Sequence, residues 1–195
     1  MENKSGISET AQVLNELVAV FEDLAIDYFL TGSLASGVRG EFRATNDIDV
    51  VAKIDRAKIN LFVKMISVNF FAQEKSIQDA IENNKSFNII HKEFVLKVDI
   101  FTEINDLANE QLSRATKLKI PSSDLSLSVA TSEDIILSKL IWYKKGNQQS
   151  ERQWRDILGV IAVTGLKLDN VYLFKWASKL GLVEMLELAF KDAKN

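Results

Sequence analysis

The sequence of 195 residues contains no cysteine, one proline, one histidine and eight glycines. Without cysteine the chain can form no disulfide, perform no thiol chemistry and bind no zinc through thiolates. A single histidine excludes a metal site built from several imidazoles. Because proline and glycine are the strongest breakers of regular structure, their scarcity predicts long helices and no flexible linker.

Long apolar runs are also missing, since no stretch approaches the roughly 20 residues that span a bilayer and the first residues are polar. We therefore expect a cytoplasmic protein. The net charge of -3 argues against a broad basic surface for nucleic acid, although a local basic patch is compatible with it. A hydrophobic content of 47% supports a real core, and the length suits one domain with an appendage or two small domains.

Two aspartates stand two positions apart in the apolar segment Asp47-Ile-Asp49-Val-Val, which we predict to be a strand. Because side chains alternate along a strand, Asp47 and Asp49 should leave the same face of a sheet. Two carboxylates held this close repel each other unless a cation lies between them. Mg²⁺ prefers hard oxygen ligands and often combines one or two carboxylates with substrate phosphates. The pair therefore predicts a site for Mg²⁺ or Mn²⁺.

A glycine and a serine precede this strand. The apolar run at 28–30 predicts an earlier strand, which ends at Gly32, and Ser33 then opens a short helix to about residue 40. Backbone N–H groups at the start of a helix, together with a serine hydroxyl, are suited to a phosphate. The alternative is a plain turn followed by a solvated strand edge. We favour the functional interpretation, because charges alternating with apolar residues make a poor ordinary strand.

The order Gly32-Ser33, then Asp47-Ile-Asp49, resembles the signature of the nucleotidyltransferase fold superfamily, the DNA polymerase β-like fold. The resemblance implies an α+β fold in which a small mixed sheet is flanked by helices. It implies a nucleoside triphosphate as substrate, with Mg²⁺ or Mn²⁺ held by the aspartates, and phosphate binding by the Gly-Ser pair. Arg43 fits the basic residue that often precedes the Asp-x-Asp motif in bacterial members, where it would meet phosphates or hold Asp47. A surface arginine is an equal alternative.

A third acidic residue follows later in the chain. Residues 86–90 and 93–101 predict two antiparallel strands, and Asp99 lies between Val98 and Ile100 in the second strand. The superfamily places its third carboxylate in this setting, so the resemblance implies that Asp99 ligates metal or takes the proton from the attacking hydroxyl. A solvated strand aspartate is the alternative.

Two basic residues near Asp99 are less informative. Lys97 shares its face of the strand, where it either points to the same cleft or is a surface lysine. Residues 91–92 form the predicted turn, in which the lone His91 is expected to be solvated and to carry no chemistry.

The carboxy-terminal third of the chain has a helical pattern, so we predict a nucleotidyltransferase domain at 1–130 and a helical domain at 131–195. Thr131, with an acid three residues on, predicts the start of its first helix. The helices expected there are 131–145, 150–163, 169–179 and a last one reaching residue 193. Elsewhere we expect helices at 9–26, 55–68 and 106–114, a strand at 125–130, and a short helix or loop at 76–83.

Two segments of these helices, 133–140 and 150–157, resemble the carboxy-terminal part of the AbiEii-type nucleotidyltransferases. These are bacterial proteins, several of them toxins of toxin–antitoxin or phage-defence pairs. In that group a lysine on the first helix and an arginine–aspartate element on the second helix face the nucleotide. By position these are Lys139 and Asp156, and the arginine is Arg152 or Arg155, whose roles stay open together with that of Arg39. Without the resemblance, all would be ordinary charges on amphipathic helices.

Our first functional hypothesis is a Mg²⁺-dependent nucleotidyltransferase that moves a nucleoside monophosphate to a hydroxyl of tRNA, protein or a small molecule. The acidic balance weakly disfavours a long RNA, since phosphate contacts need many cations. A second hypothesis is a nucleotide-binding, nucleotidyltransferase-like protein that acts through a cognate partner protein without transfer. A third is an aminoglycoside-type enzyme that modifies a small molecule.

Overall fold

A computed structural model describes residues 4–39, 47–119 and 126–194. The chain divides into two compact units, Met1–Leu30 with Thr45–Val129, and Thr31–Ala44 with Ala130–Asn195. The two domains predicted at 1–130 and 131–195 stay a prediction, since the second unit also takes Thr31–Ala44. In addition, the helix that follows the first strand groups with the carboxy-terminal helices. We describe each unit by itself.

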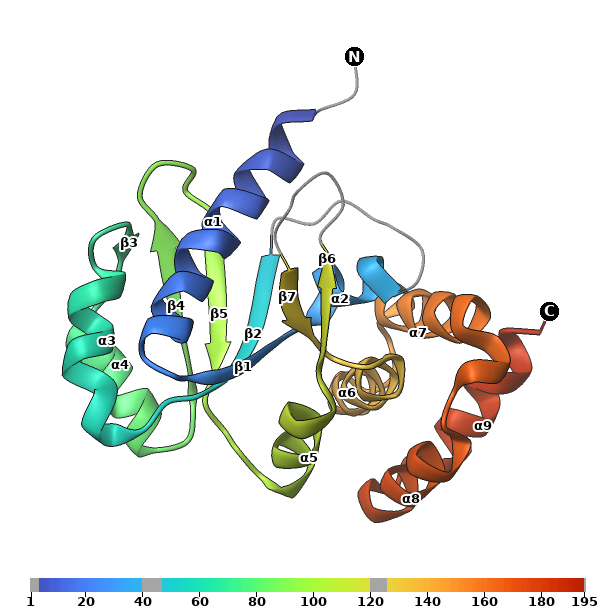
Figure 1. Cartoon of the computed structure of the whole chain (residues 1–195). Coiled ribbons are helices and arrows are strands. Elements are labelled where there is room, and N and C mark those ends of the chain that lie inside the picture. Colours follow the sequence, from blue (N-terminus) through green and yellow to red (C-terminus); the bar gives the residue numbers. More distant parts are fainter. Residues whose placement is uncertain (1–3, 40–46, 120–125, 195) are drawn as a thin grey trace. The chain divides into compact units, whose positions relative to one another are not determined.

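The first unit is built on a mixed sheet with the strand order β3-β4-β5-β2-β1-β7-β6 (Figure 1). Strands β2 and β5 pair in parallel, as do β1 and β7, whereas the pairs β3/β4, β4/β5 and β6/β7 are antiparallel. The strands are β1 Asp27–Thr31, β2 Asp47–Lys53, β3 Phe70–Phe71, β4 Ser86–His91, β5 Lys97–Phe101, β6 Thr116–Lys119 and β7 Ser126–Val129. The predicted small mixed sheet with its antiparallel pair is therefore confirmed, although the second strand of that pair begins at Lys97 and not at the predicted residue 93.

The helices of the first unit each bury apolar side chains. They are α1 Lys4–Asp23, α3 Ile59–Ile66, which follows the short 3₁₀ turn η1 Arg56–Lys58, α4 Glu74–Glu82 and α5 Asp106–Arg114. Phe21 of α1 contacts Tyr28 of β1 and Phe62 of α3, and Phe62 in turn meets Phe87 of β4 edge to face. Such aromatic pairs add to the burial of their area. This chain of rings fixes α1 and α3 on one face of the sheet.

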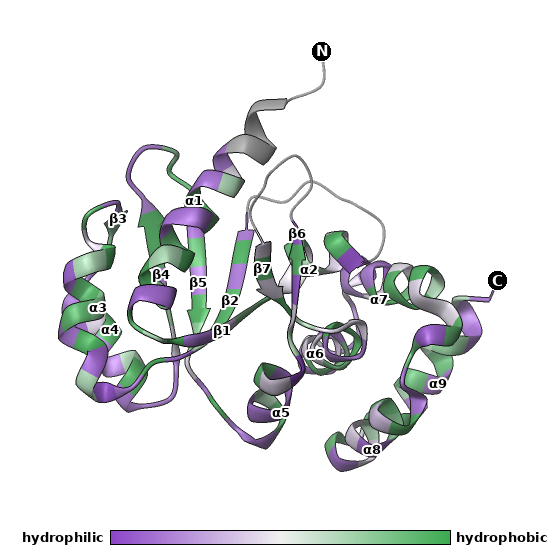
Figure 2. Ribbon diagram, in the orientation of Figure 1, coloured by the Kyte–Doolittle hydropathy of each residue, from purple (hydrophilic) through white to green (hydrophobic). Residues whose placement is uncertain are grey.

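Alternation in β2 and β5 decides what the two faces of the sheet carry. Ile48, Val50 and Ala52 are buried, as are Val98 and Ile100, whereas the residues between them are exposed or half-buried. Figure 2 shows both hydrophobic and hydrophilic residues along these two strands. Each strand thus buries one side in the core and presents a polar side opposite to it.

The single histidine corrects one expectation. His91 belongs to β4, is only 2% exposed and stacks on Phe94, with Phe70 edge-on. Its Nε2 lies 3.0 Å from the carboxylate of Glu16, and its Nδ1 accepts the backbone N–H of Phe94. The prediction of a solvated histidine was wrong. A local sequence pattern could not reveal this contact, because Glu16 lies in a helix 75 positions earlier.

The second unit consists of helices in the part of the chain described. They are α2 Gly32–Arg39, α6 Ser132–Lys145, α7 Glu151–Thr164 with the short 3₁₀ turn η2 Gly165–Lys167, α8 Asn170–Leu180 and α9 Val183–Asp192. Side chains of Thr131, Ser150 and Asp169 accept N–H groups in the first turns of α6, α7 and α8. Such caps satisfy backbone donors that have no partner within a helix. The carboxy-terminal helical bundle predicted from sequence is confirmed.

Buried polar groups fix the ends of these helices. Asp134 is fully buried and accepts a hydrogen bond of 2.6 Å from the hydroxyl of Tyr172 on α8, while the hydroxyl of Thr131 donates to its other oxygen. Glu133 accepts the backbone N–H of Asp169. Buried carboxylates are tolerated only when they are hydrogen-bonded in this way. The first turn of α6 is therefore held to the start of α8 by these two carboxylates. Of the helices described, none is long and apolar enough to cross a bilayer.

Candidate active site

The acidic residues of the first unit lie on two neighbouring strands. Asp47 and Asp49 alternate with buried residues along β2, so both belong to the polar face, as predicted. In the parallel ladder, Asp49 is the partner of Asp99 on β5, and Asp47 is the partner of Lys97. Since adjacent strands lie about 4.8 Å apart, this register places Asp99 beside Asp49 on one face. The Asp-x-Asp pair and the third acid therefore form one acidic face, a term used below for Asp47, Asp49 and Asp99.

The carboxylates of the acidic face are accessible to solvent. Asp47 is exposed and Asp49 is half-buried. The side chain of Asp99 is 25% exposed. Their backbones lie in central strands of the sheet while their side chains reach solvent, so the acidic face is open to an incoming ligand.

Lys97 is the basic member of this face. Its Nζ lies 2.7 Å from Oδ2 of Asp99. The hydrogen bond to Asp99 and the charge of that carboxylate raise the pKa of Lys97, and the charges of Asp47 and Asp49 act in the same direction. One ammonium therefore sits within the field of three carboxylates, and it reduces their mutual repulsion.

One observation favours a divalent metal at these residues and one opposes it. Three carboxylates on adjacent strands supply the hard oxygen donors that Mg²⁺ and Mn²⁺ prefer. As the side chains lie, however, no group of three or more acidic, histidine or cysteine residues in the described chain is arranged to hold a metal ion. Asp99 is directed to Lys97 instead. Residue types and strand register thus fit a metal, and one ligand must change partner to bind it.

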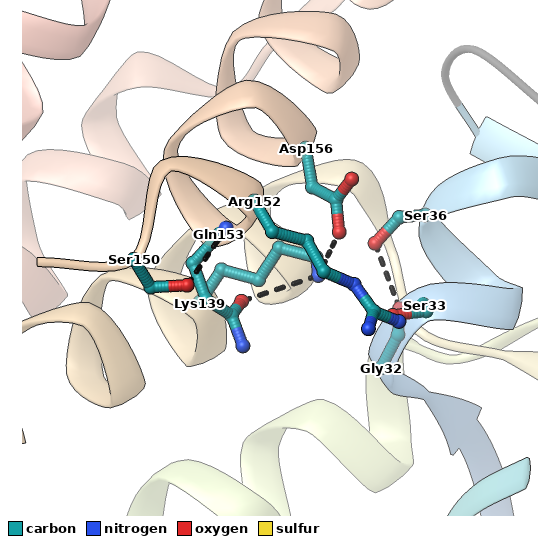
Figure 3. Close-up of polar contacts among 8 residues, drawn as sticks. All are labelled: Gly32, Ser33, Ser36, Lys139, Ser150, Arg152, Gln153 and Asp156. Atoms are coloured by element: carbon teal, nitrogen blue, oxygen red, sulfur yellow. Dashed lines mark hydrogen bonds and ion pairs between the residues drawn. The ribbon is translucent and has the colours of Figure 1, made fainter. Parts of the chain in front are cut away.

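The Gly-Ser pair opens α2 in the second unit. Gly32 has a φ of +67°, a conformation that suits glycine, and its carbonyl accepts the hydroxyl of Ser36 at 2.7 Å. Ser33 lies in the first turn of α2, where its Oγ accepts a hydrogen bond of 3.3 Å from Nη2 of Arg152 on α7 (Figure 3). A helix start, a hydroxyl and a guanidinium here meet in one place, and all three are groups that bind phosphate.

Lys139 and Asp156 form a buried ion pair in the same unit. The Nζ of Lys139 on α6 lies 2.7 Å from Oδ2 of Asp156 and 3.3 Å from Oε1 of Gln153, both on α7 (Figure 3). The side chains are 5% and 12% exposed. The resemblance assigned both residues to the nucleotide, and that role stays a prediction. Because the ammonium is enclosed by groups of α7, its evident effect is to join α6 to α7.

The remaining arginines have different surroundings. Arg39 donates from Nε to the carbonyl of Ala130, and burial lowers its pKa, although nearby carboxylates of α6 oppose the shift. Arg155 lines a hollow of about 330 Å³ together with Tyr143 and Trp154, whose tilted rings have their centroids 5.0 Å apart. Arg43 lies outside the described residues. Of the two arginines that the sequence left open on α7, Arg152 is the one beside Ser33.

Comparison with known proteins identifies the fold. No protein-family model matches the chain, and no curated protein matches it. Among solved structures, the antibiotic-resistance factor ANT(2'')-Ia is 12% identical with a TM-score of 0.55, over 92% of this chain and 97% of that one. An antigenic nucleotidyltransferase-like protein from Paracoccidioides brasiliensis is 17% identical with a TM-score of 0.53, over 96% and 93%. The lincosamide antibiotic adenylyltransferase LnuA is 14% identical with a TM-score of 0.47, over 77% and 96%.

These likenesses show that the chain has the α+β nucleotidyltransferase fold predicted from its Gly-Ser and Asp-x-Asp motifs. Two residues that the sequence left ambiguous gain defined neighbours in the structure, Lys97 beside Asp99 and Arg152 beside Ser33. The only signal for Lys97 was its place two positions before Asp99. That the acidic face and the Gly-Ser pair serve one substrate stays a prediction.

Proposed function

We propose that this protein is a nucleotidyltransferase, which binds a nucleoside triphosphate with Mg²⁺ or Mn²⁺ and moves the nucleoside monophosphate to an acceptor hydroxyl. The acceptor oxygen bonds to the α-phosphorus, the bond from that phosphorus to the β-phosphate oxygen breaks, and pyrophosphate leaves. The observation that carries the proposal is the register of β2 and β5, which sets Asp49 beside Asp99 with Asp47 on the same face. The fold shared with nucleotidyltransferase-like structures supports it.

In this proposal the acidic face performs the chemistry. Asp47 and Asp49 hold the metal, and Asp99 completes the ligand set and accepts the proton of the attacking hydroxyl. The bound metal would supply charge neutralisation at the phosphates and orient the attacking and leaving oxygens. The solvent access of all three side chains supports a role that requires an incoming ligand.

The phosphate-binding groups come from α2 and α7. The backbone N–H groups that follow Gly32, the hydroxyl of Ser33 and the guanidinium of Arg152 hold the triphosphate. Arg43 keeps its predicted role toward the phosphates. For Lys139 and Asp156, which the resemblance assigns to the nucleotide, the buried pair favours a positioning role: it fixes α7, which carries Arg152.

The class of acceptor is open among tRNA, a protein side chain and a small molecule. The structural likeness to ANT(2'')-Ia, described as an antibiotic-resistance factor, gives one reason to include antibiotics among the small molecules tested. Aminoglycosides belong to that panel because of the third hypothesis from the sequence. The closeness to AbiEii-type proteins, and with it a role in a toxin–antitoxin or phage-defence pair, stays a prediction from the two helical segments.

A transfer assay tests the proposal. The protein is incubated with each of the four nucleoside triphosphates labelled at the α-phosphate, with Mg²⁺ or Mn²⁺, and with tRNA, cell protein or a panel of hydroxylated antibiotics. We expect label to enter one acceptor class with the wild type and not with Asp49→Ala. The matched control is Asp79→Ala, which removes an exposed aspartate of α4 in the same unit.

The possible results separate the hypotheses. Nucleotide binding by calorimetry without labelled product would favour the nucleotide-binding partner protein. Equal labelling of an acceptor by the wild type and Asp49→Ala would show transfer activity but would refute the assignment of the site to the acidic face.

A further inference from the structure

Lys97 stands on the acidic face as one cation among three anions. It is the ladder partner of Asp47, and it precedes Asp99 by two positions on the same side of β5. Its Nζ contacts Oδ2 of Asp99 at 2.7 Å, and the charges of Asp47 and Asp49 also act on it. This ammonium offsets part of the repulsion between Asp49 and Asp99, which are like charges side by side in neighbouring strands.

We propose that Lys97 is the counter-cation of the acidic face in the metal-free protein, and that a divalent cation binds by displacing its ammonium from Asp99. The inference rests on the proposed function, because it takes the three aspartates as the metal ligands. It explains why the described side chains form no group that could hold a metal although the donors are present: Asp99 is directed to a competing cation.

The exposure of the pair makes this exchange feasible. The side chains of Lys97 and Asp99 are 46% and 25% exposed, so each can be solvated when the contact opens. A lysine ammonium on a flexible stem in such a solvated pair is held weakly. The pair of Lys139 and Asp156 is the contrasting case, since its side chains are 5% and 12% exposed and separation would leave two buried charges.

Competition has a direct consequence for metal affinity. As long as Lys97 is present, an incoming divalent cation must displace or approach a positive charge. Removing that charge should therefore tighten metal binding. The opposite effect is expected if Lys97 instead holds Asp99 in a geometry that the metal needs. The sign of the change in affinity thus distinguishes competition from support.

The experiment measures Mn²⁺ binding in the absence of nucleotide, by the paramagnetic resonance signal of free Mn²⁺ and by calorimetry. Lys97→Met and Lys97→Gln should both bind Mn²⁺ about tenfold more tightly than the wild type, the effect expected from removing one nearby charge in a solvated site. Lys97→Arg keeps the charge and should stay within about twofold of the wild type. Lys117→Met removes a strand lysine that pairs at 3.1 Å with Glu22, so it controls for net charge and should leave the affinity unchanged.

Thermal unfolding supplies a second readout. Without metal, Lys97→Met should unfold at a lower temperature than the wild type, and Mn²⁺ should restore more stability to it than to the wild type. Unchanged or weaker Mn²⁺ affinity in both Lys97→Met and Lys97→Gln would overturn the competition. If the wild type binds Mn²⁺ and loses it in Asp49→Ala, that result leaves the proposed function standing. Absence of Mn²⁺ binding by the wild type without nucleotide would overturn the competition, whereas the transfer assay with triphosphate decides the proposed function separately.

Discussion

Arg152 donates a hydrogen bond of 3.3 Å to the hydroxyl of Ser33, and so joins the first turn of α7 to the first turn of α2. The two residues are 119 positions apart in the sequence, yet both belong to the same unit. Ser33 follows Gly32, whose positive φ starts α2 directly after β1. The guanidinium thereby adds a full positive charge to a helix start that has only the partial charge of its N–H groups.

We expect Arg152→Gln to weaken nucleoside triphosphate binding about tenfold, the loss expected for one charged hydrogen bond to phosphate. The effect should appear in KM or in Kd by calorimetry, with kcat within about threefold of the wild type, because the arginine binds the phosphates rather than the reacting oxygen. Arg155→Gln is the matched control on the same helix, since Arg155 lines the hollow with Tyr143 and Trp154. Equal losses in both variants would contradict the assignment to Arg152.

A double-mutant cycle tests the buried pair of Lys139 and Asp156. Asp156→Leu should lower the free energy of unfolding by about 3 kcal/mol, since it leaves an ammonium buried among α7 groups. Lys139→Met with Asp156→Leu should recover much of that loss, because no charge is then left buried. Urea unfolding of the two single variants and the double variant gives the coupling energy. Additive losses would show that the two charges do not act as a pair.

The acidic face shows what the alternation of side chains along a strand can predict, and what it cannot. Asp47 and Asp49 could be placed on one face from sequence, because they alternate with the apolar residues Ile48 and Val50. The third carboxylate could be placed on a strand, and the resemblance assigned it to the site. The pairing of Asp47 with Lys97 is a property of the register between strands 50 positions apart, which no local pattern determines. Lys97 therefore stayed ambiguous until the ladder was known.

Arg152 and His91 illustrate the same limit for packing. Two arginines three positions apart lie near each other on α7, but only the packing of α2 against α7 decides which one reaches Ser33. His91 stands in a polar stretch that has the composition of a turn, and its burial depends on Phe70, Phe94 and the distant Glu16. Helix and strand existence followed from local pattern, whereas these contacts are tertiary.

The environment of His91 predicts a structural role. Because its Nδ1 accepts the N–H of Phe94, the proton lies on Nε2, which donates to Glu16. We expect His91→Ala to lower the free energy of unfolding by about 3 kcal/mol, through a cavity between two phenylalanine rings and an unpaired backbone N–H. Specific transfer activity of the folded fraction should equal that of the wild type. A loss of activity at full folding, judged by circular dichroism, would contradict this role.

Asp99 gives the sharpest test of the proposed chemistry. Asp99→Asn keeps the shape of the side chain but cannot accept a proton as a carboxylate does, and it removes one charged metal ligand. If Asp99 is the base, kcat should fall by a factor of about 10² to 10⁴, the usual contribution of proton transfer to a positioned group. Stability should change by less than about 1 kcal/mol, since the ion pair with Lys97 is exposed to solvent. Single-turnover transfer with saturating triphosphate and Mn²⁺ separates the loss of chemistry from weaker binding.

Asp79→Asn, on the exposed side of α4, should transfer at the wild-type rate. A kcat for Asp99→Asn within tenfold of the wild type would assign the proton to another acceptor and leave Asp99 only its place beside Asp49.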